Sequence, residues 1–122
     1  MRDLWPIERK ILEIASAEYP ASAEAILQQA ATAQVVNFEN SGSGFFSDLV
    51  VAEEVPLIVE KSPLDSGVAS LPGIGYGMGC LVFLKNGRLS MIEGYSQGGE
   101  PTENIDFSQT VYTLTPWTKM AL

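Results

Sequence analysis

The sequence predicts an α+β fold, with two N-terminal helices packed on a mostly antiparallel β-sheet of five or six strands. Three observations predict it. Apolar residues recur at helical spacing up to about residue 34 and then follow the shorter period of strands. Short apolar runs in the remainder are separated by turn residues. An Asn86-Gly87 pair divides two apolar runs within residues 80–94, and both residues tolerate the positive φ of a tight hairpin turn.

The helices are expected near the start of the chain. Asp3 can cap the first helix, Pro6 is tolerated in its opening turn, and Tyr19-Pro20 ends it. The second helix is expected to begin near Ser22. The expected core-facing residues are Ile7, Ile11, Ile14, Ala15 and Glu18 in the first helix, and Ala23, Ile26, Leu27, Ala30 and Ala31 in the second.

Six segments have the composition of strands. They are Val35–Phe38, Phe45–Ala52, Leu57–Val59, Gly77–Leu84, Arg88–Glu93 and Thr110–Leu114. Residues 41–44, 62–67, 71–73 and 97–101 are expected to form the turns between them. At 122 residues the chain is expected to be one domain, helical over 1–34, sheet over 35–115, with a tail over 116–122.

The register of the hairpin has two solutions. A two-residue loop pairs Leu84 with Leu89, whereas a three-residue loop with Gly87 as a bulge pairs Phe83 with Leu89. The second is favoured because it avoids placing Lys85 opposite Arg88. Both faces of the hairpin are apolar, so we expect one face under the helices and the other against a partner.

The charge and composition of the chain limit the classes of partner that it is expected to bind. The net charge is −8, and residues 35–106 hold ten acidic and three basic residues, a net of −7. Such a field repels nucleic acid and anionic membranes and attracts a basic protein. Charged residues are only 18% of the chain, so exposed apolar surface is expected, which favours a homodimer or another protein partner. A single cysteine and the lack of a leader pattern predict a cytoplasmic protein.

Catalytic motifs are weak. The chain has no histidine, which excludes Ser-His-Asp and Cys-His systems and histidine metal sites. Gly94–Gly98 matches the G-x-S-x-G pattern but lacks the base that it needs, and Asp65-Ser66-Gly67 is interpreted as a turn rather than a protease loop. Cys80 is expected to be a buried, inert thiol. We therefore assign no catalytic residue, no metal and no cofactor.

The candidate site is a partner or ligand surface at the end of the second hairpin strand. Its residues are Phe45, Phe46, Asp48, Glu93, Tyr95, Glu100 and Glu103, and the last four are expected at the rim. The function that this pattern favours is non-enzymatic binding, as an acidic immunity-like or regulatory partner of a basic protein. The alternative is a small-molecule-binding or carboxylate-based hydrolytic domain with its site near Glu93 and Tyr95.

Two segments, Gly42–Asp48 and Leu81–Tyr95, resemble a family of small uncharacterised bacterial proteins. That family has a Gly-Phe-Phe strand start and an Asn/Asp-Gly-Arg-Leu hairpin that ends in Glu-Gly-Tyr. The resemblance implies an α+β fold and a bacterial cytoplasmic setting, and it implies no activity. The family pattern often continues into an acidic-Pro-Trp-Pro segment, whereas Gly98–Pro101 follows here.

Overall fold

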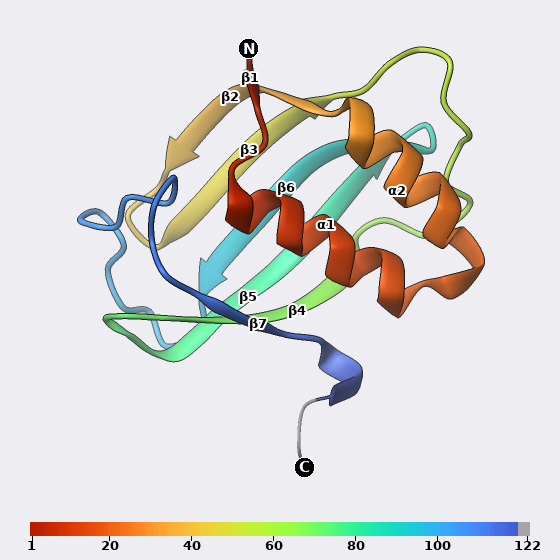
Figure 1. Ribbon diagram of the computed structural model, residues 1–122. Coiled ribbons are helices and arrows are strands. Elements are labelled where there is room, and N and C mark those ends of the chain that lie inside the picture. The colour runs from red at the N-terminus through yellow and green to blue at the C-terminus, as the bar shows by residue number, and fades with distance from the viewer. Residues whose placement is uncertain (120–122) are drawn as a thin grey trace.

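Two helices, α1 (Pro6–Glu18) and α2 (Ala23–Thr32), lie on one face of a seven-stranded antiparallel sheet (Figure 1). This computed structural model describes residues 1–119. The predicted α+β class is confirmed, with one or two strands more than expected. Residues 120–122 of the predicted tail lie outside the described residues, and residues 117–119 form a short 3₁₀ helix, η2.

The first helix begins two residues later than predicted. Trp5 is its N-cap, and the Glu8 carboxylate accepts the Trp5 backbone N–H at 2.7 Å. Asp3 does not cap this helix, because it lies in β1 (Arg2–Asp3) and pairs with Gln34. The predicted stripe is otherwise well placed, since Ile7, Ile11 and Ala15 are buried with Leu12 against the sheet.

The second helix presents a different face from the one predicted. Ser22 is at the N-cap position, as expected, after the 3₁₀ turn η1 (Pro20–Ser22). Leu27 and Ala31 are exposed, and the inward positions are Ile26 and Gln29. The rotation has a physical cause, because the Gln29 amide binds the backbone of the hairpin turn below it.

The sheet has the strand order β1-β2-β3-β6-β5-β4-β7. After β1, the strands are β2 (Gln34–Asn40), β3 (Gly44–Val50), β4 (Leu64–Leu71), β5 (Ile74–Lys85), β6 (Arg88–Ser96) and β7 (Thr113–Thr115). The long hairpin β5–β6 thus occupies the middle of the sheet, as its two apolar faces predicted.

One predicted strand and one predicted turn are wrong. Residues 57–59 form no strand; Ile58 is buried in a loop and its N–H donates to the Gly87 carbonyl at 2.8 Å. Residues 62–67, predicted as a turn, contain the start of β4. There the Ser66 hydroxyl donates to the Ile11 carbonyl at 2.6 Å, which ties this strand to α1.

The hairpin turn has two residues, so the favoured three-residue loop is wrong. Asn86 and Gly87 have φ values of 53° and 76°, the signs that a type I′ turn requires. Leu84 pairs with Leu89, and Lys85 stands opposite Arg88. One register shift follows in β6, after which Phe83 pairs with Met91 and Leu81 with Glu93. That shift carries both Leu89 and Ile92 into the core.

Aromatic rings close the core at the end of the sheet near the N-terminus of α1. Phe45 is fully buried, and its ring centroid lies 4.8 Å from that of Phe107. Phe38 and Trp5 extend this cluster, with their centroids 4.7 Å apart. Phe107 arrives from the long 97–112 segment, which is pinned to the β2–β3 hairpin by a bond from the Asn40 amide to the Thr102 carbonyl.

Candidate functional site

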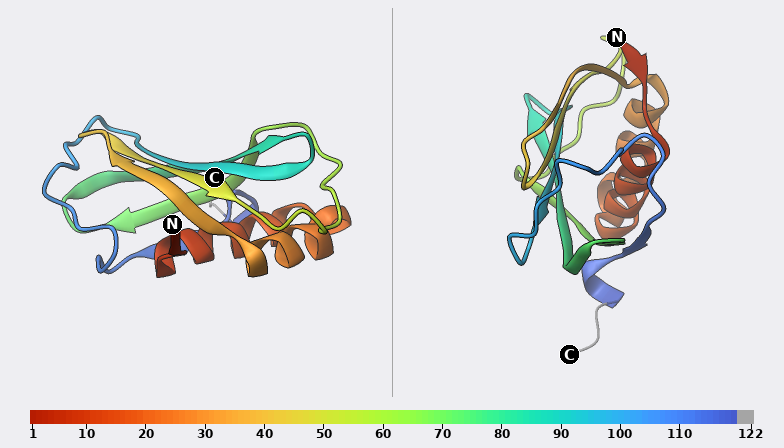
Figure 2. Two further views of the ribbon diagram at one scale, coloured as in Figure 1. Left: turned by 90° about the horizontal axis from the view of Figure 1, so that it is seen from above. Right: turned by 90° about the vertical axis from the view of Figure 1, so that its left-hand side faces the viewer.

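Within residues 1–119, no helix lies on the face of the sheet opposite α1 and α2 (Figure 2). Directly paired residues cross five of its strands in the order Glu39, Phe46, Glu93, Leu81, Asp65. Because directly paired residues share a face, acidic and apolar side chains alternate along this line, which we call the acidic row. At about 4.8 Å per strand the row spans roughly 19 Å, with its carboxylates about 10 Å apart.

Apolar side chains flank the acidic row on both sides. On one side, Asp48 pairs with Met91, which pairs with Phe83. On the other side, Tyr95 lies over Gly79, where a Cβ would overlap its ring. We call the following set the outer face: Phe46, Val68, Leu81, Phe83, Met91 and Tyr95 with the acids Glu39, Asp48, Asp65 and Glu93. The six apolar and aromatic members are each only partly buried.

In the part of the chain that the structure describes, the carboxylates of the outer face form no ion pair. Within residues 1–119 the ion pairs are Arg2–Glu8 and Lys10–Glu13, and both involve α1 on the opposite side of the sheet. Asp48 receives only a long 3.4 Å hydrogen bond from the Asn37 amide. The outer face is therefore a negatively charged, partly apolar surface whose carboxylates form no ion pair within residues 1–119, and Lys85 lies at its turn end, two residues after Phe83 on β5.

The structure brings together four of the residues predicted for the site. Phe46, Asp48, Glu93 and Tyr95 all belong to the outer face, on neighbouring strands β3 and β6. Phe45 does not, because successive residues of a strand point to opposite faces and its ring is buried on the inner face against Phe38 and Phe107. The prediction that Phe45 forms part of a surface is therefore wrong.

Two of the expected rim residues, Glu100 and Glu103, lie in the segment after β6. Glu100 accepts the Tyr76 N–H and the Ser96 hydroxyl, both at 2.9 Å. The Tyr76 N–H is the main reason that the pKa of Glu100 is lowered from its ordinary value. Glu103 is exposed, close to Gly42 in the β2–β3 turn. Glu100 thus fastens its loop to the sheet.

The motifs noted in the sequence have structural explanations. Ser96 ends β6 and is followed by a turn, not by the helix of a nucleophile elbow. Asp65, Ser66 and Gly67 lie within β4, not in a turn. Burial raises the pKa of Cys80 to about 12, so its thiolate is scarcely populated near neutral pH. Among residues 1–119 no cluster of three or more histidine, cysteine or acidic side chains is arranged to hold a metal ion.

The sequence pattern did not predict a buried cluster around the Glu8 carboxylate. Glu8 is fully buried, and its carboxylate accepts two bonds from the Arg2 guanidinium, at 2.8 and 2.9 Å, besides those from the Trp5 N–H and the Ser47 hydroxyl. The Arg2 guanidinium in turn lies 3.4 Å from the centroid of the Trp5 ring. With every acceptor position occupied, Glu8 joins β1, α1 and β3, and we interpret the cluster as structural.

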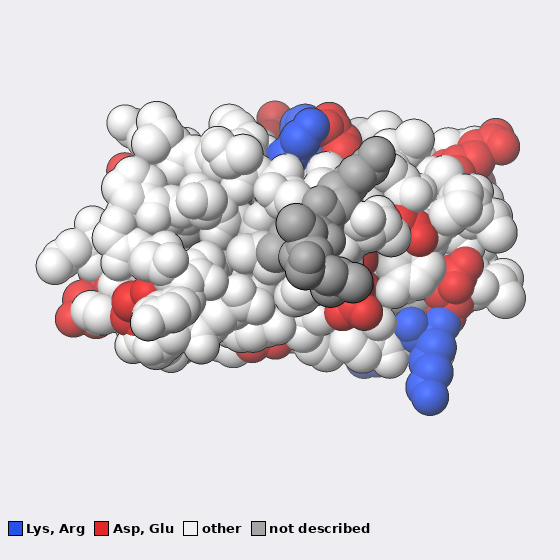
Figure 3. Space-filling view, turned by 90° about the horizontal axis from the view of Figure 1, so that it is seen from below, with Lys and Arg blue, Asp and Glu red and all other residues white. Residues whose placement is uncertain are grey.

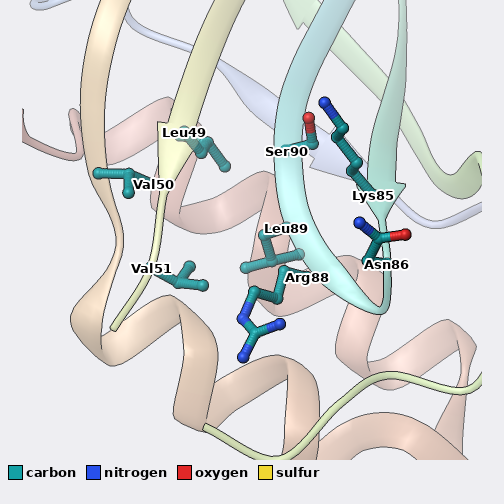
Figure 4. A pocket seen from close by; sticks show the side chains of 8 residues that line it. All are labelled: Leu49, Val50, Val51, Lys85, Asn86, Arg88, Leu89 and Ser90. Carbon is teal, nitrogen blue, oxygen red and sulfur yellow. The ribbon is translucent and has the colours of Figure 1, made fainter. Parts of the chain in front are cut away.

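The sequence pattern also did not predict a cleft at the end of the sheet, where β3 and β6 separate. Pairing between them stops at Asp48 and Met91. Beyond that point a space of about 260 Å³ is lined by Leu49, Val50, Val51, Lys85, Asn86, Arg88, Leu89 and Ser90 (Figure 4). The sequence signal for this end of the sheet is the placement of Lys85 and Arg88 on either side of the Asn86-Gly87 turn.

No protein-family model, no curated protein and no solved structure matches this chain. The resemblance carried by Gly42–Asp48 and Leu81–Tyr95 therefore stays a prediction. No helix within residues 1–119 is long and apolar enough to cross a membrane. In the view from below, uncharged atoms cover most of the visible surface, and acidic groups are scattered over it, with basic groups at two of its edges (Figure 3).

Proposed function

We propose that this chain is a non-enzymatic binding protein whose outer face docks a basic protein partner. The acidic row carries the proposal, because it places three carboxylates and two apolar side chains in one line across five strands. A partner with cations spaced about 10 Å apart and apolar groups between them would be complementary to that line.

The apolar members of the outer face support an interface rather than a solvated surface. Met91 pairs with Phe83, Leu81 is the next outward residue of β5 after Phe83, and Phe46 lies diagonally across from Met91 on β3. Aromatic residues and methionine are enriched at the centres of protein interfaces, where charged rims surround them. Association would remove this patch from water, while the acidic row would orient the partner.

The charge of the outer face favours a different protein over a second copy of this chain. A two-fold dimer through this face would set the acidic row of one copy against that of the other. Like charges placed together across an interface disfavour association. We therefore separate the predicted homodimer from this surface and assign the surface to a basic partner.

The alternative of a carboxylate-based hydrolase has less support. Acid–base hydrolysis by paired carboxylates needs the two groups on either side of one bond. The two residues directly paired with Glu93 are Phe46 and Leu81, so its row neighbours are apolar. The Tyr95 ring lies on Gly79, and the Tyr95 hydroxyl forms no hydrogen bond to another side chain or backbone group within residues 1–119.

The test is affinity capture with the full chain, followed by identification of the bound protein and calorimetric titration of that purified protein. The supporting result is a basic protein that binds more weakly as salt is raised. Glu93→Lys should weaken its binding at least tenfold, because it puts a cation in the centre of the acidic row. Glu13→Lys, an exposed change on α1, is the matched control and should change the affinity less than twofold.

Three outcomes would overturn the proposal. One is a captured protein that binds Glu93→Lys as tightly as the native chain. Another is the absence of any capture that depends on Glu93. The third is self-association, measured by light scattering, that Glu93→Lys abolishes, since this would give the outer face to a second copy.

A further inference from the structure

The residues of the acidic row repeat with a period that an α-helix can match. Its carboxylates, on Glu39, Glu93 and Asp65, stand on every second strand, so they are about 10 Å apart. Phe46 and Leu81 lie between them. In an α-helix, residues i and i+7 lie on nearly the same side, about 10.5 Å apart along the axis, and residues i+3 and i+4 lie on that side about 4.5–6 Å along. A helix with a cation at every seventh position and apolar residues between therefore repeats the spacing of the row.

An extended strand does not match this spacing. Its same-side residues recur about 6.7 Å apart. A strand laid along the row that alternated cations with apolar residues would have its cations about 13 Å apart, against about 10 Å between neighbouring carboxylates. The mismatch of roughly 4 Å at the first repeat would double at the second, whereas a helix is out of step by about 2 Å over the whole row. The spacing of the carboxylates thus favours a helix over a strand.

The width of the acidic and apolar part of the outer face also fits one helix. Phe83 and Met91 lie two residues along their strands from the row on one side, and Tyr95 lies two residues away on the other, about 7 Å in each case. A helix with its side chains is about 10–12 Å across, so it would cover the row and touch these three side chains. Lys85 lies four residues beyond Leu81 on β5, about 13 Å from the row. A partner sheet packed face to face would also cover Lys85, which adds nothing to the attraction of a basic surface.

We infer that the basic partner docks through an amphipathic helix that lies across the strands of the outer face. Arginine or lysine residues seven apart would pair with Glu39, Glu93 and Asp65. Apolar residues between them would cover Phe46 and Leu81. The inference rests on the proposed function of this face and names the element that the partner presents. A docked helix would complete a helix–sheet–helix arrangement, since α1 and α2 cover the opposite face (Figure 2).

The twist of the sheet ranks the three carboxylates of the row. Glu39 and Asp65 lie two strands away from Glu93, on either side of it. Adjacent strands are rotated by roughly −20 to −25°, so the two end side chains splay by about 40–50° to opposite sides of a straight helix. The long side chains of arginine or lysine can reach them. Glu93 stands under the middle of the helix, and we expect it to contribute more than either end.

The experiment is a titration of the full chain with model peptides, followed by amide chemical shifts. The test peptide has three arginines seven residues apart and leucines three and four residues after each of the first two, with alanine and glutamine elsewhere, in a helix of about 18 residues. One control has the same composition with its arginines on the side opposite the leucines. A second control carries a central proline, which breaks the helix. We expect saturable shifts at Phe46, Leu81 and Glu93 with the test peptide, and binding at least tenfold weaker for both controls.

Three variants check where the helix lies. Glu93→Lys should weaken binding of the test peptide at least tenfold, and Asp65→Lys, at the end of the row, should weaken it by roughly threefold. Lys85→Gln, at the turn end, should change the affinity less than twofold, because the helix does not reach it. Asp65 is exposed, so its variant is expected to fold and tests the row independently of Glu93→Lys.

The inference is overturned if the test peptide does not bind, or if either control peptide binds as tightly, which would indicate only general charge attraction. It is also overturned if the shifts fall outside the outer face, or if both Glu93→Lys and Asp65→Lys leave the affinity unchanged. The capture experiment tests the proposed function separately. A captured basic protein whose binding depends on Glu93, but which the test peptide does not displace, would refute the helix and leave the docking surface in place.

Discussion

Replacing Gln29 with methionine is expected to destabilise the protein far more than the same change at the adjacent Gln28. The Gln29 side chain is fully buried under α2. Its amide nitrogen donates to the Pro56 carbonyl at 2.8 Å and the Gly87 carbonyl at 2.9 Å, and its oxygen accepts the Leu89 N–H at 2.8 Å. One side chain therefore holds a helix, a loop and the turn of the central hairpin.

The magnitude follows from the groups that lose partners. Methionine keeps the volume but forms none of these bonds, so the buried N–H of Leu89 is left unsatisfied, at a cost of about 1–3 kcal/mol. The Gly87 carbonyl retains the Ile58 N–H, and the Pro56 carbonyl lies on an exposed residue, so these losses are smaller. The expected decrease in the free energy of unfolding is about 2–4 kcal/mol.

Urea unfolding measures this change. With a denaturant slope of about 1.5 kcal/mol per molar, the midpoint should fall by roughly 1.3–2.7 M. Gln28 is exposed and bonds only to Glu24, at 3.0 Å, so Gln28→Met should change stability by less than about 0.5 kcal/mol. Equal effects of the two substitutions would refute this account of the hairpin register, as would unchanged hydrogen exchange at the Leu89 amide in Gln29→Met.

Three further predictions concern buried groups. Glu8→Gln should lower the free energy of unfolding, measured in urea, by about 2–4 kcal/mol, because the Arg2 guanidinium loses its carboxylate partner. The control Glu13→Gln, at an exposed residue, should change the free energy of unfolding by less than about 0.5 kcal/mol. Similar values for the two variants would contradict a structural role for Glu8. The folded-state pKa of Cys80 is raised above its ordinary 9.0 to about 12, so its contribution to stability is full below pH 9.0 and is lost as the pH rises toward about 12. Unfolding of the native chain beside Cys80→Ala across that range checks this, and rapid labelling of the native thiol at neutral pH would count against it. Gly94→Ala should cost about 1–3 kcal/mol, since its Cβ would stand 2.5 Å from Phe45 Cε1 and 2.6 Å from Met78 Sδ; a neutral change in the melting temperature would mean that the Phe45 ring is not packed as described.

The features that depend on local pattern could be predicted from the sequence. The helical period marks α1 and α2, and the alternation around Asn86-Gly87 marks the central hairpin. β4 could not be found in this way, because Pro63 and Gly67 are turn residues in most contexts. Its strand conformation comes from pairing with β5 and from the bond of Ser66 to α1, both of which join distant parts of the chain.

The residues of the candidate site could be predicted in part, as the fold could. Alternation on a strand places Glu93 and Tyr95 on one face, and the same rule would have separated Phe46 from Phe45. The repulsion between Lys85 and Arg88 seemed sufficient to reject a two-residue turn. It is outweighed in the structure by the positive φ preference of Asn-Gly and by the buried bonds of Gln29, which the sequence does not reveal.

The terminal strands of the sheet have a consequence for growth by strand addition. At one end β1 has two residues, and at the other β7 has three and is followed by Pro116, which has no N–H to offer. Sheets with long unprotected borders recruit further chains and polymerise into fibrils. Because β1 and β7 are so short, the uncovered borders of the sheet are residues 36–40 of β2 and 64–67 of β4, and borders of that length limit the growth of the sheet by strand addition.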